Sequence, residues 1–151
     1  MFKIYCIKPI SGASADTVFS YYERIQKTLT DIGYDVLVPL HGKGEMRTET
    51  KFKAHGYENS PMTTNHAIFG RDKFFVQHSD ILFANFLGAT QVSIGSVMEI
   101  AIGNILGKQI VVCMEKDNIM QHAFVLEAAT IVFHTEEESL NYLAKLVHKE
   151  F

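Results

Sequence analysis

The sequence predicts one α/β domain over residues 1–151, built on a mostly parallel sheet of five strands with helices on both faces. Short apolar runs alternate along the chain with longer amphipathic segments, which is the pattern of strands joined by helices. Such an alternation favours right-handed crossovers and parallel pairing. A chain of 151 residues is also large enough to bury one hydrophobic core without disulfides or metals.

The first expected elements are a buried strand over residues 3–7, a loop of small residues over 11–14, and a helix. The apolar residues of this helix recur every three or four positions, which places them on one face. They are Val18, Tyr22, Ile25, Leu29 and Ile32. Gly33 follows and predicts a left-handed end to the helix.

A second strand is expected over residues 34–40, with a proline near its end. Residues 41–62 carry glycines and charges without periodicity, which predicts a long loop. Loops of this length often cover a binding site, and a disordered excursion fits the composition equally well. Residues 63–78 form the next expected helix, with Thr64 or Asn65 as its cap.

The second half of the chain continues the alternation. It predicts strands over residues 81–84, 109–114 and 130–133, and helices over residues 94–106, near 118–124 and from Glu136 onward. Gly107 ends the first of these helices, and the last carries an apolar face of Leu140, Leu143 and Leu146.

Composition and charge narrow the class of partner. The formal net charge is −3 and the basic residues are scattered, which argues against a nucleic acid polymer or an anionic membrane. No signal segment or run of membrane-spanning length is evident, so we expect a cytoplasmic protein with a small-molecule partner. Cys6 and Cys113 lie in apolar runs and are expected to be free thiols. The seven histidines lack zinc-site spacing, so neither a metal nor another cofactor is predicted.

The place of a binding site follows from the predicted sheet. Ligands of open parallel sheets bind beyond the carboxyl ends of the strands, near the point where the strand order reverses. The loops after Ile7, Leu40 and Asn85 are therefore expected to surround one crevice.

Glu99 is the only charged residue between residues 81 and 107, and the sequence leaves two interpretations of it open. Ser96 and Glu99 have the spacing of a capping box, in which each side chain satisfies the other's backbone amide. Alternatively, the amide dipoles of the first helical turn keep the carboxylate ionised at the sheet edge, where it can act as a nucleophile.

Three further polar residues are candidates. Asp72 falls on the apolar stripe of its helix, so it is either paired, with Arg71, Lys73 or a neighbouring helix, or it borders a cavity. Beside a cavity, burial would raise its pKa into the range for proton transfer. Asp80 stands at the start of a strand, where a cap or hydrogen-bond anchor is the first interpretation. Tyr5 lies in the first strand, and its hydroxyl needs a partner if buried.

Several short motifs follow one another in a distinctive order over nearly the whole chain. They are Ile4-Tyr5, Pro9-Ile10-Ser11-Gly12, Arg71-Asp72, Ser79-Asp80-Ile81 and Ser93-Ile94-Gly95-Ser96-Val97-Met98-Glu99. This combination resembles the nucleoside 2-deoxyribosyltransferase family, including its 2'-deoxynucleoside 5'-monophosphate N-glycosidase branch. The resemblance implies a flavodoxin-like, doubly wound fold.

The resemblance also implies roles for individual residues. Glu99 would attack the anomeric carbon of the sugar and form a glycosyl ester, with Tyr5 orienting it. Asp72 would protonate the departing base, and Asp80 would help to shape the base end of the site. Gly95 lies in the matched segments and is expected at the substrate, as is Gly12. Such roles are chemically consistent, because an oxocarbenium-like transition state needs a nearby anion and a nitrogen leaving group needs a proton.

Two departures from the family pattern point to different branches. Transferases typically carry an acid at the position of Ser93. The monophosphate glycosidases have a serine there, as this chain does. Asn118 and the two residues after it instead resemble the transferase segment that reaches a neighbouring subunit's sugar, which implies a homodimer or larger homo-oligomer with shared active sites. Lys8 and Ser11 could bind phosphate, although Ser11 replaces the arginine of the glycosidase loop.

The leading prediction is transfer of a 2-deoxyribosyl group between nucleobases, in two displacements through Glu99. The nearest alternative is a nucleoside or 2'-deoxynucleoside 5'-monophosphate N-glycosidase that uses water as the acceptor. A noncatalytic nucleotide-binding module is the alternative from another class, because a fold does not determine a function.

Overall fold

The centre of the molecule is a sheet of five parallel strands in the order β2-β1-β3-β4-β5. The computed structural model describes residues 1–41, 43–57 and 60–148. Its strands are β1 (Lys3–Ile7), β2 (Asp35–Leu37), β3 (Ile81–Asn85), β4 (Gln109–Cys113) and β5 (Ile131–Phe133). The predicted parallel sheet of five strands is therefore confirmed.

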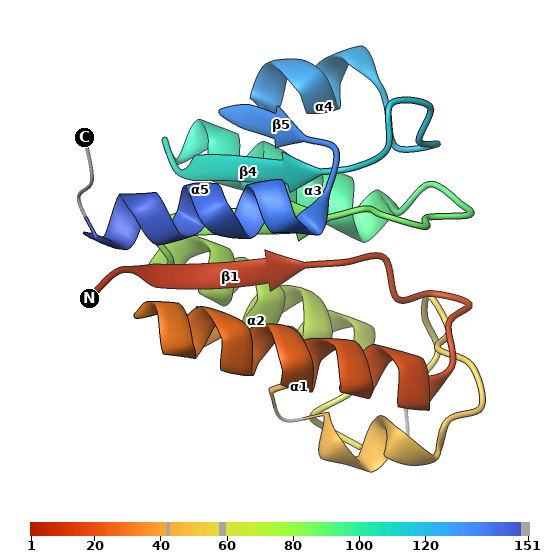
Figure 1. Cartoon of the computed structure of the whole chain (residues 1–151). Helices are drawn as coiled ribbons and strands as arrows, with labels where there is room; N and C mark the ends of the chain where they lie inside the picture. The colour runs from red at the N-terminus through yellow and green to blue at the C-terminus, as the bar shows by residue number, and fades with distance from the viewer. Residues whose placement is uncertain (42, 58–59, 149–151) are drawn as a thin grey trace.

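Helices cover both faces of this sheet (Figure 1). They are α1 (Ala15–Ile32), α2 (Asn65–His78), α3 (Ile94–Ile105), α4 (Ala123–Ala128), α5 (Glu136–His148) and a short 3-10 helix, η1 (Gly44–Thr48). In Figure 1, α1 and α5 lie in front of the sheet and α2 and α3 lie behind it. The doubly wound arrangement is thus also as predicted.

The strands divide the core into two layers, because successive side chains point to opposite faces. Ile4 and Phe83 belong to the layer that includes Leu29 of α1. Tyr5 belongs to the opposite layer, together with Ile100 of α3. The alternation therefore directs Tyr5 toward the helices behind the sheet.

The strand order reverses at β1, which pairs with β2 on one side and with β3 on the other. The chain leaves β1 through α1 on the front face and reaches β3 through α2 on the back face (Figure 1). Loops that leave neighbouring strands in opposite directions open a crevice at the carboxyl edge of the sheet.

Helix boundaries follow the local signals closely. Ser14 caps α1 by accepting a hydrogen bond from the Thr17 backbone N–H at 3.2 Å. Gly33 ends that helix with a φ of 118°, in the left-handed region that glycine adopts most easily. Thr64, one of the two predicted caps, is the cap of α2.

Two expected elements differ from the structure. The strand expected over residues 34–40 covers only Asp35–Leu37, because turns follow in which the Lys43 N–H donates to the Leu40 carbonyl. The short helix expected near residues 118–124 is present but begins later, since turns occupy residues 116–117 and 119–120 and α4 covers Ala123–Ala128. Within the loop expected over 41–62, η1 is an element that the sequence did not predict.

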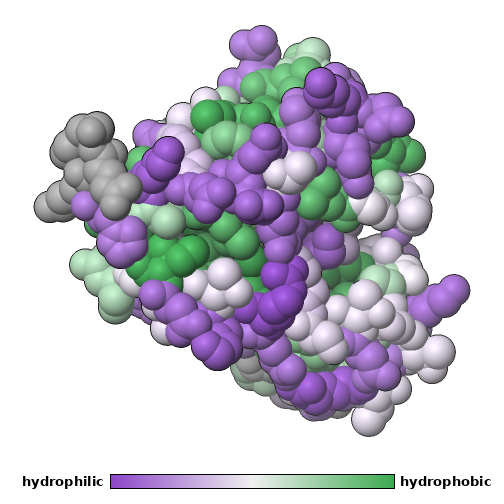
Figure 2. All heavy atoms as spheres, viewed as in Figure 1, coloured by the Kyte–Doolittle hydropathy of each residue, from purple (hydrophilic) through white to green (hydrophobic). Residues whose placement is uncertain are grey.

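The surface over α1 and α5 is largely hydrophilic (Figure 2). Across the described ranges, no helix combines the length and the apolar character needed to cross a membrane. Cys6 and Cys113 are buried and free, as predicted.

Candidate active site

A cavity of about 520 Å³ opens at the carboxyl edge of the sheet, beside β1. The loop after β1, the loop after β2, α2 and the start of α3 all contribute to its lining. Its volume suits a small organic ligand. The crevice predicted from the sheet is therefore present, and the long loop predicted over residues 41–62 supplies part of its wall.

Backbone hydrogen bonds join two of these walls. The Gly12 N–H donates to the Phe52 carbonyl, and the Phe52 N–H donates to the Ala13 carbonyl, both at 2.8 Å. Gly12 has a φ of 83°, which favours glycine at this position. Phe52 is buried and packs against Phe19 of α1. Gly12, predicted to bind substrate, therefore links the two loops and does not line the cavity.

Glu99 lines this cavity, and its carboxyl is held by the first strand. The Tyr5 hydroxyl donates a hydrogen bond to Glu99 Oε1 at 2.7 Å. The cap of α3 is Ser93, whose Oγ accepts from the Ser96 N–H at 3.3 Å. Glu99 thus stands in the second turn of the helix, so both the capping box with Ser96 and the placement in the first turn are wrong. The pairing of Glu99 with Tyr5 replaces them.

The pKa of Glu99 is raised to about 8, because burial and then the negative charge of Asp72 raise it by more than the Tyr5 hydrogen bond and Lys43 lower it. The carboxyl therefore holds its proton for most of the time at neutral pH. Burial also raises the pKa of Tyr5, which keeps the hydroxyl a neutral donor. A cationic centre placed beside Glu99 would favour its ionised form.

Asp72 forms an ion pair and also lines the cavity. Its Oδ2 lies 3.5 Å from Nζ of Lys43, a side chain that is only 2% exposed. Burial raises the pKa of Asp72, while Lys43 and then Arg71 oppose this rise. The expected ion-pair partners are Arg71, Lys73 or a residue of a neighbouring helix, but Arg71 donates to the Met62 carbonyl at 3.0 Å. The actual partner comes from the long loop.

Four residues predicted to bind substrate line the same cavity. They are Lys8, Ser11, Ser93 and Gly95. Lys8 Nζ donates to the Leu87 carbonyl at 3.3 Å, and burial lowers the pKa of this lysine. The serines give one part of the cavity hydroxyl groups that suit an anionic or hydroxyl-rich ligand, whereas the ammonium of Lys8 lies over the ring of Tyr21, which is not among the lining residues.

Asp80 lies away from the cavity, because it precedes β3 and so stands at the amino edge of the sheet. Its Oδ2 accepts a hydrogen bond from the Lys3 N–H at 2.7 Å, and its own N–H donates to the Lys3 carbonyl at 2.8 Å. The anchor interpretation is therefore correct. A role in shaping the base end of the site is not supported, since the cavity is at the other end of the strands.

Asn118 also does not line the cavity, and its side-chain amide is engaged within its own loop. Nδ2 donates to the Phe86 carbonyl at 2.8 Å and to Glu115 Oε2 at 2.5 Å. Oδ1 accepts from the Met120 N–H at 2.8 Å. A role in a neighbouring subunit's site stays a prediction, and it would require Asn118 to give up some of these bonds.

Lys43 and Tyr22 are cavity residues that the sequence reasoning missed. Tyr22 was assigned only to the apolar face of α1, yet its buried hydroxyl has no hydrogen-bond partner within the described residues. A tyrosine at the position of an aliphatic residue was the available signal. Lys43 gave no local signal, because it is one charged residue in an aperiodic loop.

A second cavity, of about 210 Å³, shares Asp72, Glu99 and Gly95 with the first. The side chains of Phe69, Met98 and Ile102 contribute to its mainly apolar lining, among others. Both carboxyl groups can therefore be approached from two cavities of different character. Within residues 1–41, 43–57 and 60–148, no cluster of three or more His, Cys, Asp or Glu side chains could hold a metal ion.

Two neighbouring carboxyl groups of raised pKa can divide the work of a nucleophile and an acid. A shared site disfavours two negative charges, so one group keeps a proton while the other ionises. The ionised group can attack an electrophilic carbon, and the protonated group can deliver its proton to a leaving group. Of the two carboxyl groups, that of Glu99 accepts a hydrogen bond from the Tyr5 hydroxyl, which fixes its orientation.

The fold is similar to those of several solved structures. A 2-deoxyribosyltransferase from Bacillus psychrosaccharolyticus aligns with a TM-score of 0.68 and 18% identity, over 93% of this chain and 91% of that chain. A conserved protein from Enterococcus faecalis aligns with a TM-score of 0.68 and 18% identity, over 97% and 99%. The CMP N-glycosidase BcmB from Clostridium botulinum aligns with a TM-score of 0.57 and 16% identity, over 98% and 99%.

These likenesses establish the fold along almost the full chain. The resemblance noted in the sequence therefore extends to the three-dimensional arrangement. No protein-family model matches the sequence, and no curated protein matches it.

Proposed function

We propose that this protein cleaves the N-glycosidic bond of a 2'-deoxynucleoside and transfers the deoxyribosyl group to a second nucleobase. The observation that carries the proposal is the Glu99 carboxyl, which lines a ligand-sized cavity, accepts a hydrogen bond from Tyr5 and neighbours Asp72. The fold, shared with a 2-deoxyribosyltransferase and a CMP N-glycosidase, supports the choice of substrate class.

In the first displacement, a Glu99 oxygen forms a bond to the anomeric carbon while the bond from that carbon to the base nitrogen breaks. Tyr5 holds Oε1, so Oε2 is the attacking oxygen. Glu99 first passes its proton to the Asp72 carboxylate, and the base then leaves with the bonding electron pair and takes that proton from Asp72. The positive charge that develops on the sugar stabilises the ionised form of Glu99, which offsets the effect of burial on its pKa.

In the second displacement, a nitrogen of another base attacks the same carbon and releases Glu99. Asp72, ionised by the first step, accepts the proton that the incoming base loses. The two steps leave both carboxyl groups as they began, and the sugar keeps its anomeric configuration because it is inverted twice.

Hydrolysis of a 5'-monophosphate is the second candidate, and the polar part of the cavity favours it. Lys8, Ser11 and Ser93 line the cavity, and their donors suit a phosphate. Ser93 occupies the position at which transferases of this pattern typically carry an acid. In this case water replaces the second base as the acceptor, and the covalent step is unchanged.

Product analysis separates these candidates. The protein is incubated with a 2'-deoxynucleoside or its 5'-monophosphate, each with and without a second free base, and the products are resolved by chromatography. Exchanged nucleoside supports the transferase, and free deoxyribose or its 5-phosphate alone supports the glycosidase. If neither substrate is cleaved, the proposal is wrong and a noncatalytic nucleotide-binding module becomes the better account.

The covalent intermediate has its own test. Denaturation during turnover, followed by mass spectrometry of peptides, is expected to find the deoxyribosyl group on Glu99. Glu99→Gln is the matched control and is expected to carry no adduct. An adduct at another residue would remove Glu99 from the role of nucleophile.

A further inference from the structure

Lys43 lies at the carboxyl groups of the cavity, and the displacement steps above give it no role. Its Nζ is 3.5 Å from Asp72 Oδ2, and its side chain is 2% exposed. It lines the same cavity as Glu99. Burying an ammonium without a counter-charge costs several kcal/mol, so a lysine in this position depends on the carboxyl groups beside it.

The fold fixes the backbone on which this lysine stands. The Lys43 N–H donates to the Leu40 carbonyl at 2.9 Å, and the Lys43 carbonyl accepts from the Met46 N–H at 2.9 Å. Met46 is itself buried in the core. The backbone of Lys43 is thus held on both sides, and its buried ammonium faces Asp72.

We propose that Lys43 is a positioning residue of this site, whose ammonium holds Asp72 and offsets the charge of the carboxyl groups so that Asp72 and Glu99 share one proton. This inference rests on the proposed function, because a double displacement needs one ionised and one protonated carboxyl. Without a cation, two carboxyl groups in a water-poor site would both keep their protons, and the site would lack its nucleophile.

The other titratable groups around the carboxyl groups come from three further elements. Tyr5 of β1 and Tyr22 of α1 remain neutral, because burial raises the pKa of both hydroxyls. Arg71 of α2 lowers the pKa of Asp72, although by less than Lys43 does. Lys43 lowers the pKa of both carboxyl groups, and among the described residues it is the ion-pair partner of Asp72.

The test compares Lys43→Met with Lys43→Arg and with Lys51→Met. Lys51 is an exposed lysine of the same loop that does not line the cavity, so its variant loses the same charge away from the site. Lys43→Met is expected to move the pH profile of kcat/KM upward by about one to three units, the usual effect of an opposite charge at this distance. Lys43→Arg and Lys51→Met are expected to keep the wild-type profile. A loss of activity in Lys43→Met without a shifted profile would overturn the proposal.

A second measurement does not depend on turnover. NMR titration of carboxyl carbons should give higher pKa values for Asp72 and Glu99 in Lys43→Met than in the wild type, with no change in Lys51→Met. If Lys43→Met does not fold, the Asp72→Asn variant is compared with the double variant Asp72→Asn, Lys43→Met. The pKa of Glu99 should then be higher in the double variant than in Asp72→Asn. Unchanged pKa values would contradict the proposal whatever the activity, whereas the expected shifts in a protein without glycosidic activity would contradict only the proposed function.

Discussion

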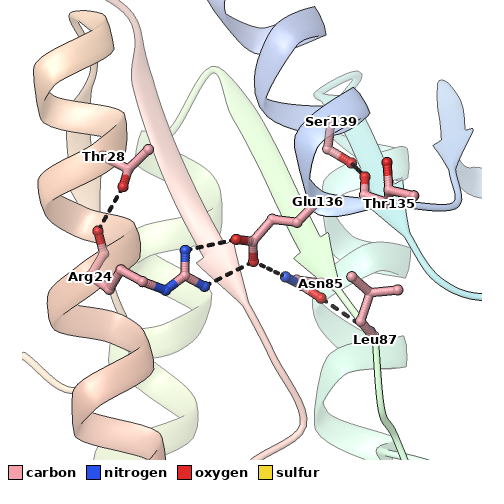
Figure 3. A network of polar contacts seen from close by, with 7 residues as sticks. All are labelled: Arg24, Thr28, Asn85, Leu87, Thr135, Glu136 and Ser139. Atoms are coloured by element: carbon pink, nitrogen blue, oxygen red, sulfur yellow. Dashed lines mark hydrogen bonds and ion pairs between the residues drawn. The ribbon is translucent and has the colours of Figure 1, made fainter.

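The two faces of the sheet carry different polar clusters at the same carboxyl edge. On the face of α1 and α5, Glu136 accepts two hydrogen bonds from Arg24, at 2.7 and 3.0 Å, and one from Asn85 at 2.8 Å (Figure 3). The side-chain oxygen of Asn85, Oδ1, accepts a hydrogen bond from the Leu87 N–H at 3.1 Å. Arg24, Asn85 and Glu136 all have partners in this structural cluster, although the hydroxyl of Tyr21, whose ring packs against Arg24, is buried without one among the described residues.

The cluster on the cavity side is left incomplete. Asp72 Oδ1 and the Tyr22 hydroxyl are buried without hydrogen-bond partners among the described residues. Lys43 and Glu99 are largely buried beside them. Unsatisfied buried groups reduce stability, and proteins retain them where they serve a site. One cluster therefore joins α1, β3 and α5, whereas the other leaves a buried acceptor of Asp72 unpaired at a cavity.

Glu99→Gln should separate the two clusters most strongly. The amide cannot act as a nucleophile, so kcat is expected to fall by at least roughly 10³-fold. Stability should hold or rise at pH 9, because the folded state raises the Glu99 pKa from 4.5 to about 8, and ionisation of the unfolded chain above pH 4.5 then favours unfolding. Single-turnover kinetics and thermal unfolding at pH 6 and 9 measure both effects. A variant that is less stable at pH 9 than the wild type would show that Glu99 stabilises the fold.

Asp72→Asn should lower activity by about 10²-fold on substrates with poor leaving bases, because the amide has no acidic proton to give. Substrates with activated bases need less protonation and should lose less. Rates with a series of bases of different basicity measure the difference. Equal losses across the series would contradict the role of Asp72 as an acid.

The pH dependence of the wild type should reflect Glu99. Below about pH 8 the carboxyl is increasingly protonated, so kcat/KM of the free enzyme is expected to fall by about tenfold for each unit toward lower pH. Initial rates from pH 5.5 to 9.5 at low substrate concentration provide the profile. A flat profile between pH 6 and 8 would show that Glu99 ionises before substrate binds.

Glu136→Ala should have the smallest effect and should act on stability alone. Removal of this carboxylate leaves Arg24 unpaired and the buried Asn85 amide without an acceptor, at a cost of about 1–3 kcal/mol. Urea unfolding measures the loss, while kcat per folded molecule should stay near the wild-type value. Asp31→Ala, which breaks the exposed ion pair with Lys27, is the control and should cost under about 0.5 kcal/mol.

Elements defined by neighbouring residues could be predicted from the sequence. The apolar spacing of α1 and the glycine after it specify both its face and its end. Glu99 stood out because one charge in a long apolar stretch needs a reason, and its contact with Tyr5 supplies that reason. Features that arise within one segment, such as an apolar face or a lone charge, can be read from the residues of that segment.

Contacts between distant segments could not be predicted in this way. Lys43 is buried because the long loop brings it against Asp72 of α2. Neither the residues around Lys43 nor those around Asp72 in the sequence indicate this contact. Asp80 showed the opposite error, since it matches a family pattern but its side chain anchors Lys3 at the other end of the strands from the cavity. A motif specifies a residue type, whereas the fold decides which end of a strand it occupies.

The paired backbone hydrogen bonds between Gly12 and Phe52 and between Phe52 and Ala13 have a consequence for binding. These bonds join the loop after β1 to the loop after β2 before any ligand binds, although the two loops are far apart in the chain. Much of the conformational entropy that a floppy rim would lose on closing has already been lost during folding. The entrance of the crevice is therefore preorganised, and a larger part of the interaction energy of a ligand contributes to its affinity.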